Sequence, residues 1–364
     1  MIQQVSLFDI WPYFLIMVFF LSRSSIQSSI ESEKKNENSC FIILFLLSIF
    51  RYNIGADYPA YWQFAQTGER DNYEFLSQII IDISYKLKFP PLLFIIYSTI
   101  TLFSLRYFIN RLSANRILSW YLYFCFPLFC FQDYSTVRQA ASIGLFLVGS
   151  IFLFDKKYLY ALCAILISAQ FHVSAYIGIL AFLMPIIRKM SKSINIILFI
   201  LSFITGQLVV RSFLTVFDGF FIAEKFMNYI SYDFAKTNTL QYLIYMMVFI
   251  NLYFYDKLVQ LDKRNVIYIG FVTIGACLFN LFQIESQTAR RLATYFLLFE
   301  LLIIPYIASA LSPFFKNYKT STQFIIILLF ILQVYYINLY INGFNNHQIS
   351  SPCFVPYDFW WNHL

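Results

Sequence analysis

The chain has 364 residues, of which 60% are hydrophobic and only 12% are charged, and its formal net charge is +7. Soluble globular domains carry about 45–50% apolar and about 25% charged residues, so this composition excludes an ordinary soluble protein. Apolar runs that cross a bilayer need about 20 residues each, and they must be helical because their backbone groups find no water in lipid. The sequence therefore predicts an all-α integral membrane protein.

Apolar runs recur along the chain and predict about twelve transmembrane helices in a single polytopic domain, residues 1–364. The charged, Ser-rich stretch 22–39 is predicted to be a flexible connection, and the sizeable loops are 51–88 and 211–238. The amphipathic stretch from Tyr73 to Leu87 is expected to lie on the membrane surface. The predicted spans are 7–22, 40–50, 89–109, 117–131, 139–154, 158–171, 173–187, 194–210, 239–255, 265–284, 292–311 and 322–341.

The basic residues divide unequally between the two sets of connections, 16 on one side and 10 on the other of the 26 Lys and Arg residues. The positive-inside rule makes the richer side cytoplasmic, so both sizeable loops and both termini face outward. Basic clusters flank both ends of the apolar run 158–187. A hairpin keeps both clusters inside and has its apex near Gln170–Ser174, which places His172 at the outer membrane boundary.

Four polar clusters fall at predicted span boundaries on the outer side: Arg51 to Tyr61, Asp133 to Gln139, His172 to Ser174, and Glu285 to Tyr295. Placing a charged arginine next to lipid costs free energy, so an arginine that is found there usually has a function. Guanidinium groups bind phosphate oxygens bidentately and stay charged, so these arginines are able to hold a diphosphate at headgroup depth without a metal. The alternative is that they extend to lipid phosphates or pair with neighbouring carboxylates.

The opening cluster combines a glycine, an acid and tyrosines. Gly55 predicts a turn with positive φ, which directs Asp57, Tyr58 and Tyr61 toward a sugar. The alternative is a helix start, with Asp57 as N-cap and Pro59 in the first turn, and it is compatible with tyrosines that line a sugar site.

Two further titratable side chains lie within the predicted membrane-spanning region. His172 is either a general base that takes the proton of an attacking sugar hydroxyl or a histidine hydrogen-bonded between helices. Glu300 lies inside a predicted span and needs a polar partner or a cavity. The six cysteines show no CxxC pattern, and the three histidines are far apart, so neither a metal nor a cofactor is expected.

The ordered set of motifs resembles the EpsG family, a branch of the Wzy-like bacterial polysaccharide polymerases, over essentially the whole chain. The matching elements are Arg51-x3-Gly55-x-Asp57-Tyr58-x2-Tyr61, Tyr73-Glu74, Arg138-Gln139, His172-x-Ser174-Ala175, Arg290-x4-Tyr295 and Val355-Pro356-Tyr357. The resemblance implies a many-helix fold of the GT-C type with an outward-facing site in the bacterial cytoplasmic membrane. It also implies a glycosyltransferase that polymerises O-antigen, capsule or exopolysaccharide repeats.

The donor implied by the resemblance is an undecaprenyl-diphosphate oligosaccharide, and the acceptor is the non-reducing sugar of another lipid-linked unit. A membrane protein that regulates chain length is an expected partner, and nucleic acid is not. The residues expected to be catalytic are His172, Arg138 and Asp57. The residues expected to bind substrate are Arg51, Tyr58, Tyr61, Glu74, Gln139, Arg290, Arg291 and Tyr295.

Two other classes of protein fit part of the pattern. A flippase of lipid-linked oligosaccharide also has many spans and arginines, but it should carry polar or broken-helix features near the bilayer midplane, often in two related halves. A membrane O-acyltransferase with His172 as its catalytic residue is the second alternative, although an outward histidine argues against it.

Overall fold

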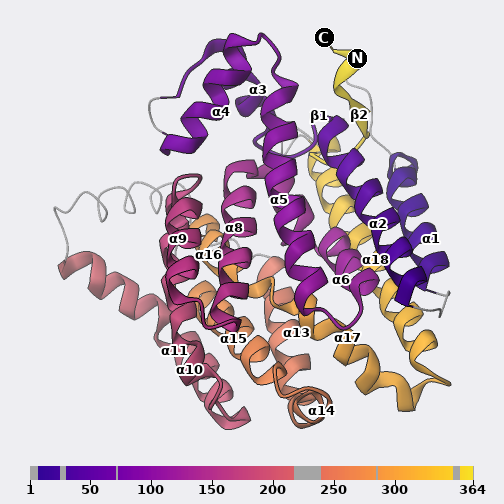
Figure 1. Ribbon diagram of the computed structural model, residues 1–364, viewed down its shortest axis with the longest axis vertical. Coiled ribbons are helices and arrows are strands. Elements are labelled where there is room, and N and C mark those ends of the chain that lie inside the picture. The colour runs from indigo at the N-terminus through magenta and orange to yellow at the C-terminus, as the bar shows by residue number, and fades with distance from the viewer. Residues whose placement is uncertain are drawn as a thin grey trace. The chain divides into compact units, whose positions relative to one another are not determined.

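The computed structural model describes residues 7–24, 30–70, 73–216, 239–283, 286–346 and 353–363, and these residues are almost entirely helical (Figure 1). The all-α prediction is therefore confirmed for the described residues. They form two compact units, one of Met1–Tyr176 with Leu311–Leu364 and one of Ile177–Ala310. That the whole chain acts as one polytopic domain stays a prediction.

The first unit is built around α5 (Pro91–Leu112), which packs against α2 (Ile30–Phe50) and α8 (Val137–Phe154). Helix α8 packs in turn against α9 (Tyr158–Ala169). Helix α18 (Tyr318–Asn345) packs against α1 (Trp11–Ser24) and α6 (Arg116–Cys125). The other elements are η1 (Leu7–Ile10), β1 (Arg51–Tyr52), α3 (Tyr58–Thr67), α4 (Phe75–Lys86), α7 (Cys130–Ser135), η3 (Ser312–Phe314), β2 (Asp358–Phe359) and η4 (Trp360–Asn362).

The second unit is centred on α15 (Asn265–Leu281), which packs against α11 (Lys192–Val216) and α16 (Ser286–Leu297). Its other elements are α10 (Met184–Ile187), α13 (Thr239–Tyr253), α14 (Tyr255–Leu261) and α17 (Glu300–Leu311), and η2 (Val173–Leu183) crosses the boundary between the units. The buried Glu300 carboxylate accepts a hydrogen bond from Asn251 Nδ2 at 2.6 Å. The predicted polar partner of Glu300 is therefore present.

Three helices of the described residues, α5, α8 and α18, are long and apolar enough to cross a membrane. The number rises to five if two bent pairs, α13 with α14 and α16 with α17, each count as one span. Shorter apolar helices cover Tyr158–Ala169, Val173–Ile187, Lys192–Gly206 and Asn265–Leu281, where spans were predicted. These helices support a multi-pass membrane protein, while the number twelve and the GT-C type stay predictions.

The break in the apolar run 158–187 is present where the charge pattern predicts it. Helix α9 ends at Ala169, and the separate segment η2 begins at Val173. The predicted amphipathic stretch is also helical, as α4, with Ile80 and Ile81 buried and Phe75 exposed. Each ion pair between described residues joins two groups predicted on the same side of the membrane, such as Arg111 with Asp155.

Helix α2 begins at Ile30, so the prediction of a flexible connection is wrong for residues 30–39. Glu37 is buried there and accepts hydrogen bonds from Arg106 Nε at 3.1 Å, from Arg106 Nη2 at 3.0 Å and from Trp120 Nε1 at 3.2 Å. A buried carboxylate is tolerated when it is paired and hydrogen-bonded in this way. The charge of Glu37 therefore marks a contact of α2 with α5 and α6 rather than a loop.

A short antiparallel ladder joins the opening polar cluster to the end of the chain. Strand β1 pairs with β2, with Arg51 opposite Phe359 and Tyr52 opposite Asp358. The Gly55 N–H donates to the Cys353 carbonyl at 2.7 Å. Gly55 has φ +112°, and a Cβ placed on it would lie 2.2 Å from the Tyr134 carbonyl oxygen. The positive φ predicted for Gly55 is confirmed, and its close contact with α7 adds a second reason for glycine.

We expect Gly55→Ala to destabilise the protein by about 2–6 kcal/mol, because it adds strain at positive φ to a clash with the Tyr134 backbone. The measurement is unfolding of the detergent-solubilised protein, followed together with the yield from membranes. Ala56→Gly, at the neighbouring exposed position, is the control and should cost less than about 1 kcal/mol. Equal stability of the two variants would contradict the contact.

Candidate functional site

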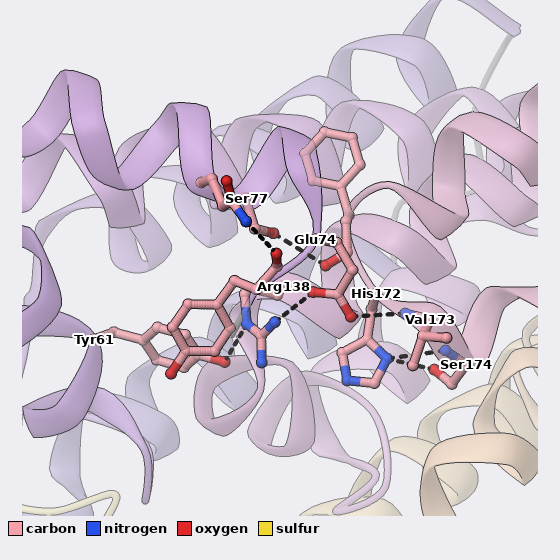
Figure 2. Close-up of polar contacts among 10 residues, drawn as sticks. Tyr61, Glu74, Ser77, Arg138, His172, Val173 and Ser174 are labelled. Atoms are coloured by element: carbon pink, nitrogen blue, oxygen red, sulfur yellow. Dashed lines mark hydrogen bonds and ion pairs between the residues drawn. The ribbon is translucent and has the colours of Figure 1, made fainter. Parts of the chain in front are cut away.

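Arg138 lies in the first turn of α8 and is held by groups from α3 and from the segment that leads into α4 (Figure 2). Its Nη1 donates to Glu74 Oε2 at 2.6 Å, and its Nε donates to the Tyr61 hydroxyl at 3.2 Å. The guanidinium carbon also lies 4.0 Å from the centre of the Tyr73 ring, within range of a cation–π contact. The side chains of Arg138 and Glu74 are 15% and 20% exposed, so the pair is accessible from one side.

Glu74 occupies the N-cap position of α4, but its carboxylate does not cap that helix. Its Oε1 accepts the backbone N–H of Val173 at 2.9 Å, while Oε2 binds Arg138. Two more bonds join α4 to the same stretch, from the Leu76 N–H to the Gln170 carbonyl at 3.1 Å and from Ser77 Oγ to the Phe171 carbonyl at 3.0 Å. The start of α4 therefore fixes the turn that carries His172.

His172 is half-buried in this turn and is bound through Nδ1 (Figure 2). Nδ1 lies 3.2 Å from the backbone nitrogen of Ser174, whose N–H donates to it, and 2.7 Å from Ser174 Oγ. A backbone N–H is always a donor, so Nδ1 is the accepting nitrogen and the ring proton of the neutral imidazole is assigned to Nε2. His172 and Arg138, from two clusters predicted on the same side of the membrane, both lie near Glu74, which binds Arg138 and the Val173 N–H (Figure 2).

The acid and tyrosines of the opening cluster have different surroundings. Asp57 has the N-cap position of α3, with Pro59 in the first turn, but it makes no side-chain capping bond. Burial raises the pKa of the Tyr73 hydroxyl, the Arg138 charge lowers it, and the negative charge of Asp57 is among the smaller causes that raise it. The charge of Asp57 therefore acts on the Tyr73 ring that stacks on Arg138.

Tyr58 is buried and stacks on Phe94, with ring centroids 4.0 Å apart. Its hydroxyl donates to the Arg51 carbonyl at 3.2 Å. Tyr61 is buried as well, but its hydroxyl reaches Arg138. The structure thus gives Tyr61 a place at the site and Tyr58 a place in the core, and a sugar contact for either tyrosine stays a prediction.

Arg51 lies apart from Arg138, inside the first unit. It is 1% exposed, donates to Ser98 Oγ at 3.0 Å and to the Ser48 carbonyl, and its guanidinium carbon lies 4.5 Å from the Tyr134 ring centre. Its Nε and Nη2 have no hydrogen-bond partner among the described residues. These are the surroundings of a buried structural arginine, and binding of substrate by Arg51 stays a prediction.

A small polar cavity opens beside Arg51, lined also by Tyr97 and Asp133. Its volume of about 10 Å³ is room for about one water molecule, which would bridge these polar groups. Asp133 accepts the Tyr123 hydroxyl at 2.7 Å. Burial raises the pKa of the Asp133 carboxyl to about 7, although the Tyr123 hydrogen bond and the Arg51 charge oppose the shift. Asp133 is the acidic residue among those that line the cavity beside Arg51, and at neutral pH its carboxyl is therefore not fully ionised.

The remaining predicted residues lie elsewhere. Gln139 follows Arg138 in α8 and is buried. Arg290, Arg291 and Tyr295 lie on α16 of the second unit, where Tyr295 is buried. Glu285 and loop residues 217–238 lie outside the described residues. A role for these residues in binding substrate stays a prediction.

Sequence reasoning missed two contributors to the site, the backbone N–H of Val173 and the hydroxyl of Ser77. No sequence signal identifies a single backbone donor. Ser77, however, is a small polar residue on the apolar face of α4, in line with the buried Ile80 and Ile81. A polar residue on such a face indicates a specific partner, which is here the Phe171 carbonyl.

These features support a multi-pass helical membrane protein with a candidate site at the start of an apolar helix, where Glu74 binds Arg138 and the backbone next to His172. The EpsG family model matches residues 38–359, and the chain therefore belongs to the EpsG family. Members of this family are Wzy-like polysaccharide polymerases. The match spans both the site and the β1–β2 ladder. No curated protein and no solved structure matches the chain.

We expect Arg51→Lys to destabilise the protein by about 3–5 kcal/mol, the usual cost of breaking a buried charged contact. A compact ammonium cannot reproduce the planar fork or its ring contacts. Unfolding in detergent measures the effect. Arg70→Lys, at a pair with Asp82 whose arginine side chain is 38% exposed, is the control and should change stability by about 0–1 kcal/mol. A stable but inactive Arg51→Lys protein would instead favour a substrate role.

Proposed function

We propose that the protein extends a bacterial surface polysaccharide at the outer face of the cytoplasmic membrane. The reaction moves a glycan from an undecaprenyl-diphosphate donor to the non-reducing end of another lipid-linked repeat unit. Membership of a polymerase family supports the general activity. The contact set of Arg138 is the observation that carries the particular reaction.

The position of Arg138 suits a lipid-linked diphosphate. It is the second residue of α8, an 18-residue apolar helix able to cross a membrane. A guanidinium at the end of a span lies near headgroup depth, where the phosphates of a polyprenyl carrier also lie. A flippase should instead carry polar or broken-helix features near the midplane. The end position of Arg138 favours transfer over transport, whereas the bent pairs α13 with α14 and α16 with α17 are a feature that a flippase would share.

The chemistry requires charge stabilisation more than it requires a metal. The acceptor hydroxyl oxygen forms a bond to the anomeric carbon of the donor, and the bond from that carbon to the diphosphate oxygen breaks. The electron pair leaves with undecaprenyl diphosphate, and the hydroxyl proton passes to a base. A guanidinium carries five N–H donors, and the bonds to Glu74 and Tyr61 use two of them. Charged donors aimed at a leaving group stabilise the transition state directly.

The proposal is tested by the length of lipid-linked glycan in a strain that lacks the gene. Single repeat units on the carrier at the outer face are expected, and the wild-type gene should restore the polymer. Loss of all outward repeats would point to a flippase. Polymer of normal length without ester groups would point to an acyltransferase.

We expect Arg138→Lys to lower polymer formation at least tenfold, a loss of about 1.4 kcal/mol or more in the transition state. Lysine keeps the charge but loses the planar fork that holds Glu74 and a diphosphate together. Polymer made by membranes with equal amounts of protein measures the effect. Arg111→Lys, at an exposed pair with Asp155, is the matched control and should leave the rate unchanged. Full activity of Arg138→Ala would overturn the assignment.

We also expect activity to persist in EDTA, because arginine supplies the positive charge at the diphosphate. The measurement is the initial rate of the purified protein in detergent, with and without the chelator. Loss of activity in EDTA that Mg²⁺ or Mn²⁺ restores would contradict an arginine-based mechanism. Attention would then turn to the acidic groups Asp57, Glu74 and Asp133 as ligands.

A further inference from the structure

The buried guanidinium of Arg51 has two nitrogens that the protein leaves without a partner. The side chain is 1% exposed, and its Nη1 donates to Ser98 Oγ at 3.0 Å and to the Ser48 carbonyl. Nε and Nη2 are also buried, but they have no hydrogen-bond partner among the described residues. In a guanidinium these two nitrogens direct parallel N–H groups to one side, which is the pair of donors that binds anions. Arg51 therefore presents an anion-binding edge that the described protein groups do not fill.

The positive charge of Arg51 also lacks a full negative partner. No ion pair joins Arg51 to a carboxylate of a described residue. Asp133 is the one acidic residue among the described residues that line the cavity, and burial raises the pKa of its carboxyl to about 7. Below that pH the cavity encloses a cation beside a neutral acid. A buried charge of this kind is costly unless a charge of opposite sign lies next to it.

The other titratable groups around the cavity supply no counter-charge between about pH 6 and pH 8. They are the phenols of Tyr97, Tyr123 and Tyr134 in the lining, the phenol of Tyr357 near Arg51, and the thiol of Cys130 near Asp133. Phenols ionise near pH 10 and thiols near pH 8.5, and burial favours their neutral forms. The charges of Arg138 and Glu74 act on the Tyr97 hydroxyl, but these two residues form an ion pair and oppose each other.

The size of the cavity limits what it can hold. Its volume of about 10 Å³ is room for about one particle of the size of water. A water molecule would accept from the donors of Arg51, but it would leave the positive charge without a partner. Phosphate, sulfate and carboxylate ligands are larger by several atoms. An ion of one atom, a halide, accepts hydrogen bonds from guanidinium and hydroxyl groups and supplies the missing negative charge.

We propose that the cavity beside Arg51 binds one chloride ion, and that the ion and the ionised form of Asp133 exclude each other. The cavity then holds one negative charge in either state, on the chloride when Asp133 is protonated and on the carboxylate when it is not. The affinity for chloride therefore falls as the pH rises through the range in which Asp133 loses its proton. This site does not depend on the proposed polymerase function.

The first test is thermal unfolding of the wild-type protein in detergent, with chloride replacing gluconate at constant ionic strength. At about pH 6, chloride at about ten times its Kd should raise Tm by about 2–5 °C. At about pH 8 the apparent Kd for chloride should be about tenfold weaker, because the protonated share of Asp133 has fallen by about that factor. No rise at pH 6 would overturn the proposal and leave the cavity to water. Equal Kd values at the two pH values would overturn the exclusion by Asp133.

The second test uses variants in the same assay. Asp133→Asn keeps the acceptor for the Tyr123 hydroxyl but cannot ionise, so its Kd for chloride should be the same at both pH values. Asp155→Asn, at the exposed pair with Arg111, is the control and should keep the tenfold change. A tenfold change in Asp133→Asn would contradict the proposal. Tyr123→Phe serves if Asp133→Asn does not fold. It removes a hydrogen bond that lowers the pKa of Asp133, so the change should be smaller than in the wild type, and an equal or larger change would also contradict the proposal.

A third measurement locates the ion directly. Bromide is a halide with a strong anomalous X-ray signal, and it should replace chloride in crystals of the protein grown in bromide at about pH 6. We expect one anomalous peak in the cavity, at hydrogen-bond distance from Nε and Nη2 of Arg51. A cavity without this peak, at bromide concentrations that saturate the rise in Tm, would reject the site. None of these readouts involves polymer, so their failure would leave the proposed polymerase function standing.

Discussion

The buried guanidinium of Arg51 is the contact on which one end of the first unit depends. It donates to Ser98 on α5 and to the Ser48 carbonyl near the end of α2, and it lies against the ring of Tyr134 from α7. The backbone carbonyl of Arg51 accepts a hydrogen bond from the hydroxyl of Tyr58 on α3. A buried charge is costly unless its surroundings are fixed, so this one residue constrains four helices at once.

The candidate site is assembled on that constrained end. Because Tyr58 and Tyr61 share the first turns of α3, the contact of Tyr58 with Arg51 also determines where Tyr61 meets Arg138. Helix α4 then adds Glu74, and Glu74 adds the turn of His172. The buried cluster of Tyr58, Tyr61, Tyr97 and Phe171 continues beneath these polar contacts, so packing and hydrogen bonding fix the same geometry.

The sequence predicted the parts of this arrangement that depend on local rules. The φ of Gly55, the break near His172 and the amphipathic α4 follow from residue conformation, charge flanks and periodicity. The sequence placed Arg138 and His172 on one predicted side of the membrane, but the contacts of Glu74 with Arg138 and with the turn of His172 come from the structure alone.

What the sequence could not provide is the pairing between distant segments. Glu37 looked like part of a charged connection until Arg106, 69 positions away, was found beside it. Arg51 and Arg138 have similar aromatic neighbours in the sequence, yet one is enclosed and the other meets Glu74 at an accessible edge. The tautomer of His172 depends on one hydrogen bond to a backbone N–H, which composition and spacing do not encode.

The β1–β2 ladder also sets an order of events during synthesis. The Tyr357 hydroxyl donates to the Leu47 carbonyl, 310 positions away in the sequence. Two more hydrogen bonds join the same two segments, from Trp360 Nε1 to the Ile49 carbonyl and from the Gly55 N–H to the Cys353 carbonyl. At a translation rate of about 5–20 residues per second, roughly 15–60 seconds separate the emergence of its two sides from the ribosome. Throughout that interval β1 lacks its partner strand β2, so the helices between them form before this end of the first unit can close.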